Sequence, residues 1–482
     1  MSSSSSYSSQ EEVEEGGEGG TPTFSGFEYN VPPSSSSTSS SRRRLEINEV
    51  WPAPFIEALS FQVAIDASRS AGRLAAAPAI FNLFRVCSTW RAVSRSELLW
   101  QNLTRHIWNN NHLSRSTWRE EFIYLHCTAN NFLLCRYVYT TLHFVLAEDD
   151  NNNDNNNHDI SLSCRRLALS GRHLAAGFAD GIVRLFHLAS RVHLATFRPQ
   201  HRDRLGRYSR AVSGIILSDT HLTFATLDGD IHVADLNHAH PPRRAHLGDV
   251  VNDGALVDFT GCGQWWVGLY AGVPGCAFHI WNNETEELVF VGGSLTDPEA
   301  VLGWHLLTEL TDLIGRVRVA SHETAVAVSS LRMVVFDLRH QGVVLGDEQV
   351  PHTASRQLVV GSADVSDDTL LIVDRGGRAS IRRVGTLEET CTFLVVRGAE
   401  AGTVASSQRV GRLLGCTNGG YAILFVGNVI DVWDIEQQHG HYLYSLAESI
   451  GEANVVVADQ RHIVAAAATS PGTINLWDFG PQ

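Results

Sequence analysis

The stretch LAAGFADGIVRLFHL (residues 174–188) decides the architecture of the second half of the chain. Two short apolar, β-branched runs flank a turn that contains Asp and Gly, which is the pattern of two strands joined by a tight turn. The same pattern returns in YAILFVGNVIDVWDI (421–435) and HIVAAAATSPGTINLWDF (462–479). A segment that recurs in this form indicates an internal repeat and not an isolated hairpin.

Seven units of this kind follow one another from about residue 160 onward. At the equivalent position in the second of the two strands they carry Phe186, Ala234, Trp281, Phe336, Arg382, Trp433 and Trp477. Successive positions are separated by little more than the ~40–45 residues typical of four-stranded propeller blades. Because four-stranded units of this size close into a ring, we predict a seven-bladed β-propeller over residues 136–482.

One further strand lies outside the repeats. The segment YVYTTLHFVL (137–146) is rich in β-branched and aromatic residues, whereas the last repeat ends after its third strand. We expect 137–146 to supply the outer strand of the last blade, which removes an exposed sheet edge. Residues 147–159, AEDDNNNDNNNHD, lack the glycine and glutamate spacing of a calcium loop and are predicted to form a flexible acidic and Asn-rich loop.

The first 45 residues have a different composition. They contain 15 Ser and 6 Glu with few aliphatic side chains. Such a segment cannot bury enough apolar surface to offset its ordering entropy, so residues 1–45 are predicted to be a disordered tail. The tail ends in three arginines at 42–44, which are either part of a nuclear import signal or a solvated cluster at a domain edge.

Residues 46–135 show helical periodicity. Phe55, Leu59 and Val63 recur at four-residue spacing, and the apolar stretch at 75–93 continues in the same way. The fold class is therefore α plus all-β, with a disordered tail, a small helical domain at 46–135 and the propeller.

Local residues mark the helix starts. Pro52 stands where the first helix is expected to begin. Ser94 with Glu97, and Thr117 with Glu120, each have the spacing of a capping box, which predicts two further helix N-termini.

Composition excludes several classes of protein. The 482 residues carry a formal net charge of −15, so the chain lacks the overall basic character of a nucleic-acid binder, and direct DNA binding is not expected. No apolar run approaches the ~18–20 residues of a membrane span, and the N-terminus has no apolar secretory core. The eight scattered cysteines fit a reduced intracellular protein, and neither a metal nor a cofactor is expected.

The segment VCSTWRAVSRSELLWQNL (86–103) resembles an F-box, a helical domain that binds a Skp1-type adaptor and through it a cullin. Trp51 and Pro52 stand where F-boxes have Leu-Pro, although further upstream than usual. The resemblance implies that the adaptor-binding residues are Trp51, Pro52, Phe55, Leu59, Val86, Trp90 and Trp100. The alternative for these side chains is that they pack the core of the helical domain.

The repeats resemble degenerate WD40 repeats, since only those at Trp433 and Trp477 keep the Trp-Asp pair. With RLGRYSRAVSG (204–214) and VNDGALVDFTGCGQWWVGL (251–269), both halves together resemble the plant STERILE APETALA family. This resemblance implies a nuclear substrate-recognition subunit of an SCF-type E3 ubiquitin ligase that regulates flower development and organ growth. The alternative is a nuclear transcriptional regulator or scaffold that controls floral identity genes without ligase activity.

All 37 basic residues are arginine, because the sequence contains no lysine. Codon bias is one explanation. The other is resistance to self-ubiquitylation in a protein that lies beside a ubiquitin-transfer centre.

No nucleophile elbow, P-loop or zinc-protease motif is present, so the chain is expected to be a non-catalytic subunit. The planar fork of arginine suits carboxylate or phosphate groups, and arginines gather in one inter-repeat loop and one turn. The candidate substrate-binding residues are Arg202, Arg204, Arg207, Arg210, Arg375 and Arg378. The alternative is solvated arginines paired with nearby acids. The expected partner is a protein substrate, such as a nuclear transcriptional repressor, and no membrane partner is expected.

Overall fold

The structure is a computed structural model that describes most of the chain from Trp51 onward. The described residues are 51–144, 162–199, 206–238, 240–293, 315–320, 323–329, 332–340, 342–349, 360–374, 376–395, 413–436, 439–468 and 472–481. The predicted tail at 1–45, its arginines at 42–44 and the predicted loop at 147–159 lie outside these residues. Among the helices described, none is long and apolar enough to cross a membrane.

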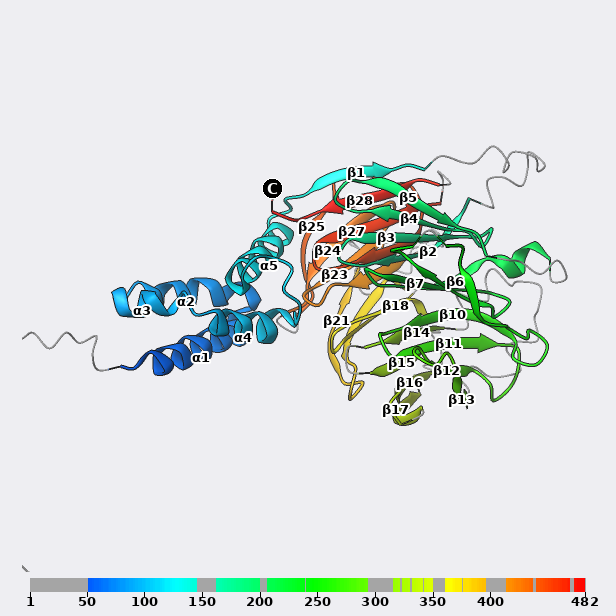
Figure 1. Cartoon of the computed structure of the whole chain (residues 1–482), viewed down its shortest axis with the longest axis horizontal. Coiled ribbons are helices and arrows are strands. Elements are labelled where there is room, and N and C mark those ends of the chain that lie inside the picture. Colours follow the sequence, from blue (N-terminus) through cyan, green and yellow to red (C-terminus); the bar gives the residue numbers. More distant parts are fainter. Residues whose placement is uncertain are drawn as a thin grey trace, which may run out of the picture. The chain divides into compact units, whose positions relative to one another are not determined.

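Helices come first in the described chain, as predicted (Figure 1). They are α1 (Ala53–Ala71), the 3-10 helix η2 (Arg73–Ala75), α2 (Ala76–Phe84), α3 (Ser88–Val93), α4 (Glu97–Trp108) and α5 (Trp118–Leu133). Their shared core contains Ile56, Ile80, Leu103 and Phe122, each no more than 1% exposed. Burial of this apolar face, and not helix propensity alone, stabilises helices this short.

Two of the three helix starts predicted from the sequence are confirmed. Pro52 is the N-cap of α1, and the Thr117 side chain accepts a hydrogen bond from the Glu120 N–H at 3.1 Å. The predicted cap at Ser94 is wrong, because α4 begins at Glu97 and its N-cap is Ser96, whose hydroxyl accepts from the Leu99 N–H. The Ser94 hydroxyl instead donates to the Arg91 carbonyl at the end of α3.

The strands that follow form antiparallel meanders of four (Figure 1). The first contains β2 (Cys164–Leu169), β3 (His173–Phe178), β4 (Val183–His187) and β5 (Val192–Phe197). The second contains β6 (Val212–Leu217), β7 (His221–Thr226), β8 (Ile231–Asp235) and β9 (Arg243–His246), and it follows the short 3-10 helix η4 (Arg207–Arg210). The third contains β10 (Ala255–Gly261), β11 (Trp265–Ala271), β12 (Phe278–Asn282) and β13 (Leu288–Gly292).

Four further meanders complete the series. The fourth contains β14 (Arg316–Val319), β15 (Thr324–Val328), β16 (Arg332–Asp337) and β17 (Val343–Gln349). The fifth contains β18 (Val360–Ser366), β19 (Thr369–Asp374), β20 (Arg378–Arg383) and β21 (Glu389–Leu394). The sixth contains β22 (Leu414–Thr417), β23 (Tyr421–Val426), β24 (Val429–Asp434) and β25 (His441–Ser445). The last contains β26 (Ala453–Ala458), β27 (His462–Ala467), β28 (Ile474–Asp478) and β1 (Val138–Leu142).

The described part of the chain is therefore mostly β in a propeller arrangement with a few helices, but the sheets differ from seven separate blades. Five four-stranded sheets stand alone, and the second and third meanders share one eight-stranded sheet. A parallel pairing of Gly214 in β6 with Phe259 in β10 joins them. A Cβ at Gly214 would lie 2.0 Å from the Phe259 carbonyl oxygen, so only glycine permits this approach of two backbones.

The prediction that the strand within 137–146 completes the last sheet is confirmed. β1 pairs antiparallel with β28, with Val138 opposite Asp478 and Leu142 opposite Ile474. In Figure 1 the cyan strand β1 lies beside the red strand β28, although the two are more than 300 residues apart. The pairing covers an edge that would otherwise leave backbone N–H and C=O groups unpaired.

The repeat positions predicted from the sequence all fall on the third strand of a meander. Phe186, Trp281 and Trp477 are fully buried there. Where Arg382 replaces the aromatic residue in β20, its guanidinium instead pairs with Glu348 of the preceding meander at 2.8 Å and with Glu389 at 3.4 Å. The first strands of the meanders contact one another in the order β2, β6, β10, β14, β18, β22, β26 and back to β2, so they line the centre of the propeller.

Candidate functional site

The start of α1 exposes an aromatic pair. Trp51 and Phe55 are 44% and 43% exposed, and their rings stack with centroids 4.6 Å apart. They lie together because the carbonyl of Pro52 accepts the Phe55 N–H at 2.9 Å and fixes the first turn. A stacked, exposed aromatic pair of this kind is suited to contact with another protein.

The other predicted interface residues divide between surface and interior. Val86 is 62% exposed between α2 and α3, and Leu59 and Trp90 are half-buried. Trp100 is buried in the helical core, where its indole N–H donates to the Ser94 carbonyl at 2.7 Å. Trp100 therefore supports the helices and does not form their surface.

The sequence interpretation missed two exposed side chains. Phe81 and Leu98 are each 60% exposed. Helical periodicity could have revealed both side chains. Ile80 and Phe84 are buried in α2, and Leu99 and Leu103 are buried in α4, so Phe81 and Leu98 point away from the core.

The structure describes only part of the predicted arginine cluster. Arg202, Arg204 and Arg375 lie outside the described residues, and of Arg207 only the place in η4 is described. Arg210 is half-buried directly before β6, and Arg378 is exposed at the start of β20. Their role in binding a substrate stays a prediction.

The helical region and the propeller meet through the last turn of α5. Phe132 is fully buried in a cluster with residues of β23, β24 and β26–β28. Its ring stacks on Phe479 with centroids 3.8 Å apart and on Tyr421 at 5.4 Å. The end of the helical region is thus part of the propeller core, which places the helices rigidly on the last two meanders.

Polar contacts surround this aromatic stack. Tyr421 donates its hydroxyl hydrogen to the Ala129 carbonyl at 3.1 Å, and Asn131 donates to the Phe479 carbonyl at 2.9 Å. Burial raises the pKa of Tyr421 well above its usual value, so the phenol remains a neutral hydrogen-bond donor.

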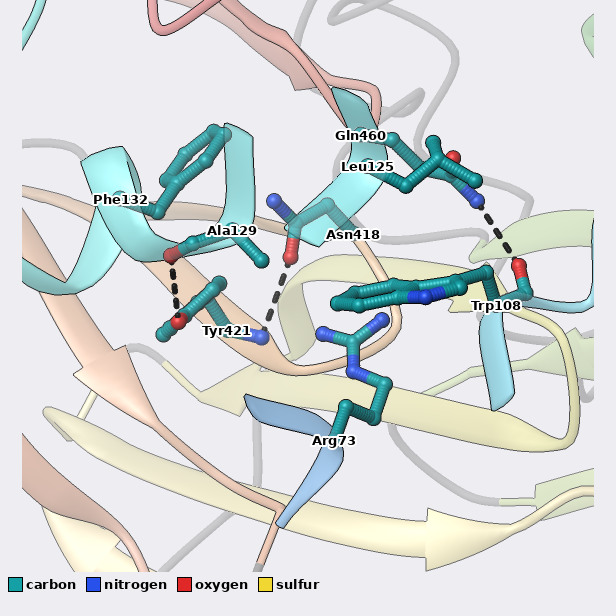
Figure 2. A pocket seen from close by; sticks show the side chains of 8 residues that line it. All are labelled: Arg73, Trp108, Leu125, Ala129, Phe132, Asn418, Tyr421 and Gln460. Atoms are coloured by element: carbon teal, nitrogen blue, oxygen red, sulfur yellow. Dashed lines mark hydrogen bonds between the residues drawn. The ribbon is translucent and has the colours of Figure 1, made fainter. Parts of the chain in front are cut away.

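A small cavity lies at this junction, and Figure 2 shows the eight residues that line it. The Arg73 guanidinium lies 5.2 Å from the centroid of the Trp108 ring and also pairs with Glu436. Gln460 donates to the Trp108 carbonyl at 3.2 Å. The cavity volume is about 10 Å³, which is room for one water molecule and not for a larger ligand.

The cysteine, histidine and carboxylate side chains of the described residues are the possible ligands for a metal ion. All eight cysteines are free thiols. Across the ranges described, no three His, Cys, Asp or Glu side chains gather in a geometry that would hold a metal ion.

The chain is similar over most of its length to a known protein. The chain is 52% identical over 441 residues to the transcriptional regulator STERILE APETALA of Arabidopsis thaliana, covering 91% of this chain and 94% of the relative. None of the protein-family models compared with the chain matches it.

Two solved structures resemble the propeller more distantly. BamB from Moraxella catarrhalis is 13% identical, with a TM-score of 0.41 over 65% of this chain and 85% of its own. The β-propeller domain of Cps50 (Swd1) from Myceliophteria thermophila is 14% identical, with a TM-score of 0.46 over 65% and 96%. Nothing about function follows from likenesses this weak.

These comparisons correct the function expected from the F-box resemblance. The relative that shares nearly the whole length is named a transcriptional regulator, and nothing found supports an F-box or a ubiquitin ligase. The interpretation as an SCF substrate-recognition subunit is therefore wrong, whereas the alternative interpretation agrees with the relative. Contacts with a Skp1-type adaptor and a cullin are tested by none of these comparisons. Identity at this level, spanning both the helices and the propeller, shows that the chain belongs to the STERILE APETALA family.

Proposed function

We propose that this protein is a transcriptional regulator of plant nuclei that works as a non-catalytic scaffold for other proteins. The observation that carries the proposal is the 52% identity to a transcriptional regulator over 91% of the chain and 94% of the relative. Because the match spans helices and propeller alike, it concerns the whole protein and not a common repeat.

The helical region supports a scaffold role through its surface. Trp51, Phe55 and Val86 expose large apolar side chains around a well-packed helical core. Aromatic side chains held in a fixed conformation lose little entropy on binding, so they favour protein contacts.

The propeller supports the same role through its rigidity. The described four-stranded meanders support a seven-bladed ring if the two halves of the eight-stranded sheet act as separate blades. Loops on such a ring are presented from fixed strand ends, which suits partner recognition. Phe132 and Tyr421 hold the helices to this ring, so a partner on one region is positioned relative to a partner on the other.

The negative net charge of the chain favours recruitment to genes through other proteins. A net charge of −15 opposes close approach to the phosphates of DNA. The proposed regulator therefore acts on promoters through a DNA-binding partner.

Tethering to a reporter gene tests the proposal. The full chain is fused to an unrelated DNA-binding domain, and reporter transcripts are measured in plant cells with and without the operator. The proposal expects an operator-dependent change in transcript level, compared with the DNA-binding domain alone. An unchanged level, with the fusion folded and nuclear, would reject it.

Nuclear location is tested separately with a fluorescent fusion. The full chain is expected in the nucleus, and replacement of the arginines at 42–44 by alanine tests whether they form the import signal. A fluorescent protein that stays outside the nucleus in both versions contradicts the proposed location.

A further inference from the structure

The outer strand β17 of the fourth meander has one free edge. It pairs with β16 and is the last strand of its sheet, so its other edge has no neighbour among the strands described. With seven residues it is the longest fourth strand of any meander described. Such an edge presents backbone N–H and C=O groups in a row, and these groups can pair with a further strand.

Apolar side chains lie along this edge. Val343, Val344 and Leu345 are 55%, 52% and 53% exposed. Val343 and Val344 are successive residues and therefore point to opposite faces of the sheet. Edge strands are commonly protected by lysine, proline or other charged residues, and none of these occurs at 343–345. The first half of β17 thus combines a free backbone edge with apolar surface on both faces.

The apolar surface continues onto the neighbouring meander. Gly342, directly before β17, lies against the third meander, because a Cβ there would be 3.1 Å from Cδ1 of Ile280 and 3.1 Å from Cδ1 of Phe290. Phe290 belongs to β13, in which Leu288 and Val291 are 42% and 43% exposed. Figure 1 shows β13 and β17 together at the lower rim of the propeller. We call the five exposed residues the rim patch: Leu288, Val291, Val343, Val344 and Leu345.

The outer strand of the first meander provides a contrast. In β5 the exposed apolar residues are Val192 and Leu194, at 54% and 51%. They are two residues apart and therefore share one face of the sheet. An added strand would find exposed aliphatic side chains on both faces at β17 but on one face at β5.

Unbalanced negative charge lies beside the rim patch. Glu284 and Glu287 are exposed in the turn between β12 and β13, and Glu287 directly precedes Leu288. Within the described ranges neither carboxylate has an ion-pair partner, whereas Glu286 between them pairs with Arg243. Opposite charges on neighbouring strands attract, so these two carboxylates favour a basic partner.

The charged groups of β17 and of the turn before it are already balanced. Their pairs are Asp347 with Arg332, Glu348 with Arg382, Arg339 with Glu323, and His340 with Asp337. The charge that a partner can balance is therefore that of Glu284 and Glu287. A second copy of this chain would bring the same carboxylates to the patch, and repulsion between like charges opposes that pairing.

We propose that β17 binds an extended segment of a basic partner protein as an additional strand of its sheet. Main-chain hydrogen bonds to the free edge hold the segment, its apolar side chains cover the rim patch, and its arginine or lysine side chains pair with Glu284 and Glu287. The inference rests on the proposed scaffold function and names the chemistry of one partner. Because binding is measured with purified protein, it can fail while the reporter test succeeds, or the reverse.

Fluorescence anisotropy with the full chain tests the site. The probe is a labelled octapeptide in which valine and arginine alternate. One control peptide is N-methylated at two successive central residues, which blocks hydrogen bonds from both edges of the strand, and another has glutamate in place of arginine. The proposal expects saturable binding of the probe that either change weakens by at least about tenfold. No saturable binding of the probe, or equal binding of the N-methylated peptide, would overturn it.

Variants of the chain locate the binding. Val344→Arg places a positive charge on the free edge and should weaken probe binding about tenfold, whereas Val192→Arg, at an equally exposed valine of β5, should leave it unchanged. Glu287→Gln should weaken binding, and Glu120→Gln, at an exposed acid of α5, is its control. Equal affinities of the wild type and Val344→Arg, or equal losses in Val344→Arg and Val192→Arg, would contradict the site. The N-methylated peptide tests the same claim without any change to the protein.

Discussion

Phe132 of α5 stacks on Phe479 near the end of the described chain, with ring centroids 3.8 Å apart and planes 11° from parallel. Both side chains are fully buried, and the cluster that holds them contains strands of the last two meanders. The helical region therefore packs directly against the propeller and is not joined to it by a linker alone.

Replacement of Phe132 tests the strength of this attachment. Phe132→Ala removes a fully buried ring and leaves a cavity, so the free energy of unfolding should fall by about 3–5 kcal/mol. Urea unfolding followed by circular dichroism measures the loss. Phe81→Ala, which truncates a side chain that is 60% exposed, is the control and should change stability by less than about 0.5 kcal/mol. Equal losses in the two variants would show that the stack does not stabilise the junction.

The ion pair of Arg73 and Glu436 makes a second attachment. Glu436 also accepts the Arg73 N–H at 2.8 Å, and both side chains are less than 20% exposed. A double-mutant cycle with Arg73→Ala and Glu436→Ala should give a coupling energy of about 1–3 kcal/mol. The cycle for Arg339 and Glu323, in which the arginine side chain is 65% exposed, should give a much smaller coupling energy. A coupling energy between Arg73 and Glu436 that is no larger than that between Arg339 and Glu323 would show that this ion pair does not stabilise the junction.

Closure of the last sheet by β1 leads to a third prediction. Deletion of residues 138–142 exposes the edge of β28 and removes Leu142, which is 1% exposed, so the propeller should lose its cooperative thermal transition. Deletion of residues 147–157, a longer segment that the sequence predicts to be a loop, should leave the transition in place because loop length costs little. A soluble β1-deletion protein that melts cooperatively would refute the closure.

Stability should fall with acid because of buried histidines. Burial lowers the pKa of His279 to about 4; Asp253 opposes this and His246 adds to it. The unfolded chain binds a proton near pH 6.5, so the contribution is complete above pH 6.5 and is lost as the pH falls toward 4. At pH 5 the loss from this residue is about 2 kcal/mol.

His279→Phe tests that prediction, since phenylalanine keeps the stack on Tyr270, now 4.0 Å between centroids, and cannot be protonated. Unfolding free energies at pH 7.5 and pH 5 should differ less in the variant than in the wild type, by about 2 kcal/mol. The same pH dependence in both proteins would mean that His279 is not the group that titrates.

Much of the architecture could be predicted from the sequence because local residue patterns determine it. The repeat positions from Phe186 to Trp477 all fall on third strands, and the Thr117 cap needs only its own helix turn. The completing strand β1 was recognisable because one repeat lacked a strand.

Contacts between residues far apart in sequence could not be predicted from such local patterns. No local pattern reveals that Gly214 permits Phe259 to pair with it, which joins two meanders into one sheet. Ser94 and Ser96 both satisfy a capping rule, yet the N-cap of the helix that begins at Glu97 is Ser96. The ion pairs of Asp258 with Arg166 and Arg318 likewise join strands far apart in sequence.

The candidate surface was predicted only in part for a similar reason. Trp51 and Trp100 are both aromatic residues in helical sequence, yet Trp51 is exposed whereas Trp100 packs between Phe84 and Phe122. Which side of a helix faces the core depends on neighbours that the sequence does not place. The F-box resemblance rested on residue types shared by such surfaces and cores alike.

The most direct test of the scaffold account is the tethered reporter with a surface variant. The full chain and its Trp51→Ala/Phe55→Ala variant are compared on the same operator, with Leu113→Ala, at another exposed apolar residue, as the control. If the aromatic pair binds the partner, the wild type and the control should change reporter transcription, and the double variant, equally folded and equally abundant, should have a weaker effect. A reporter that responds to none of the three proteins would contradict the claim that this chain regulates transcription through bound partners.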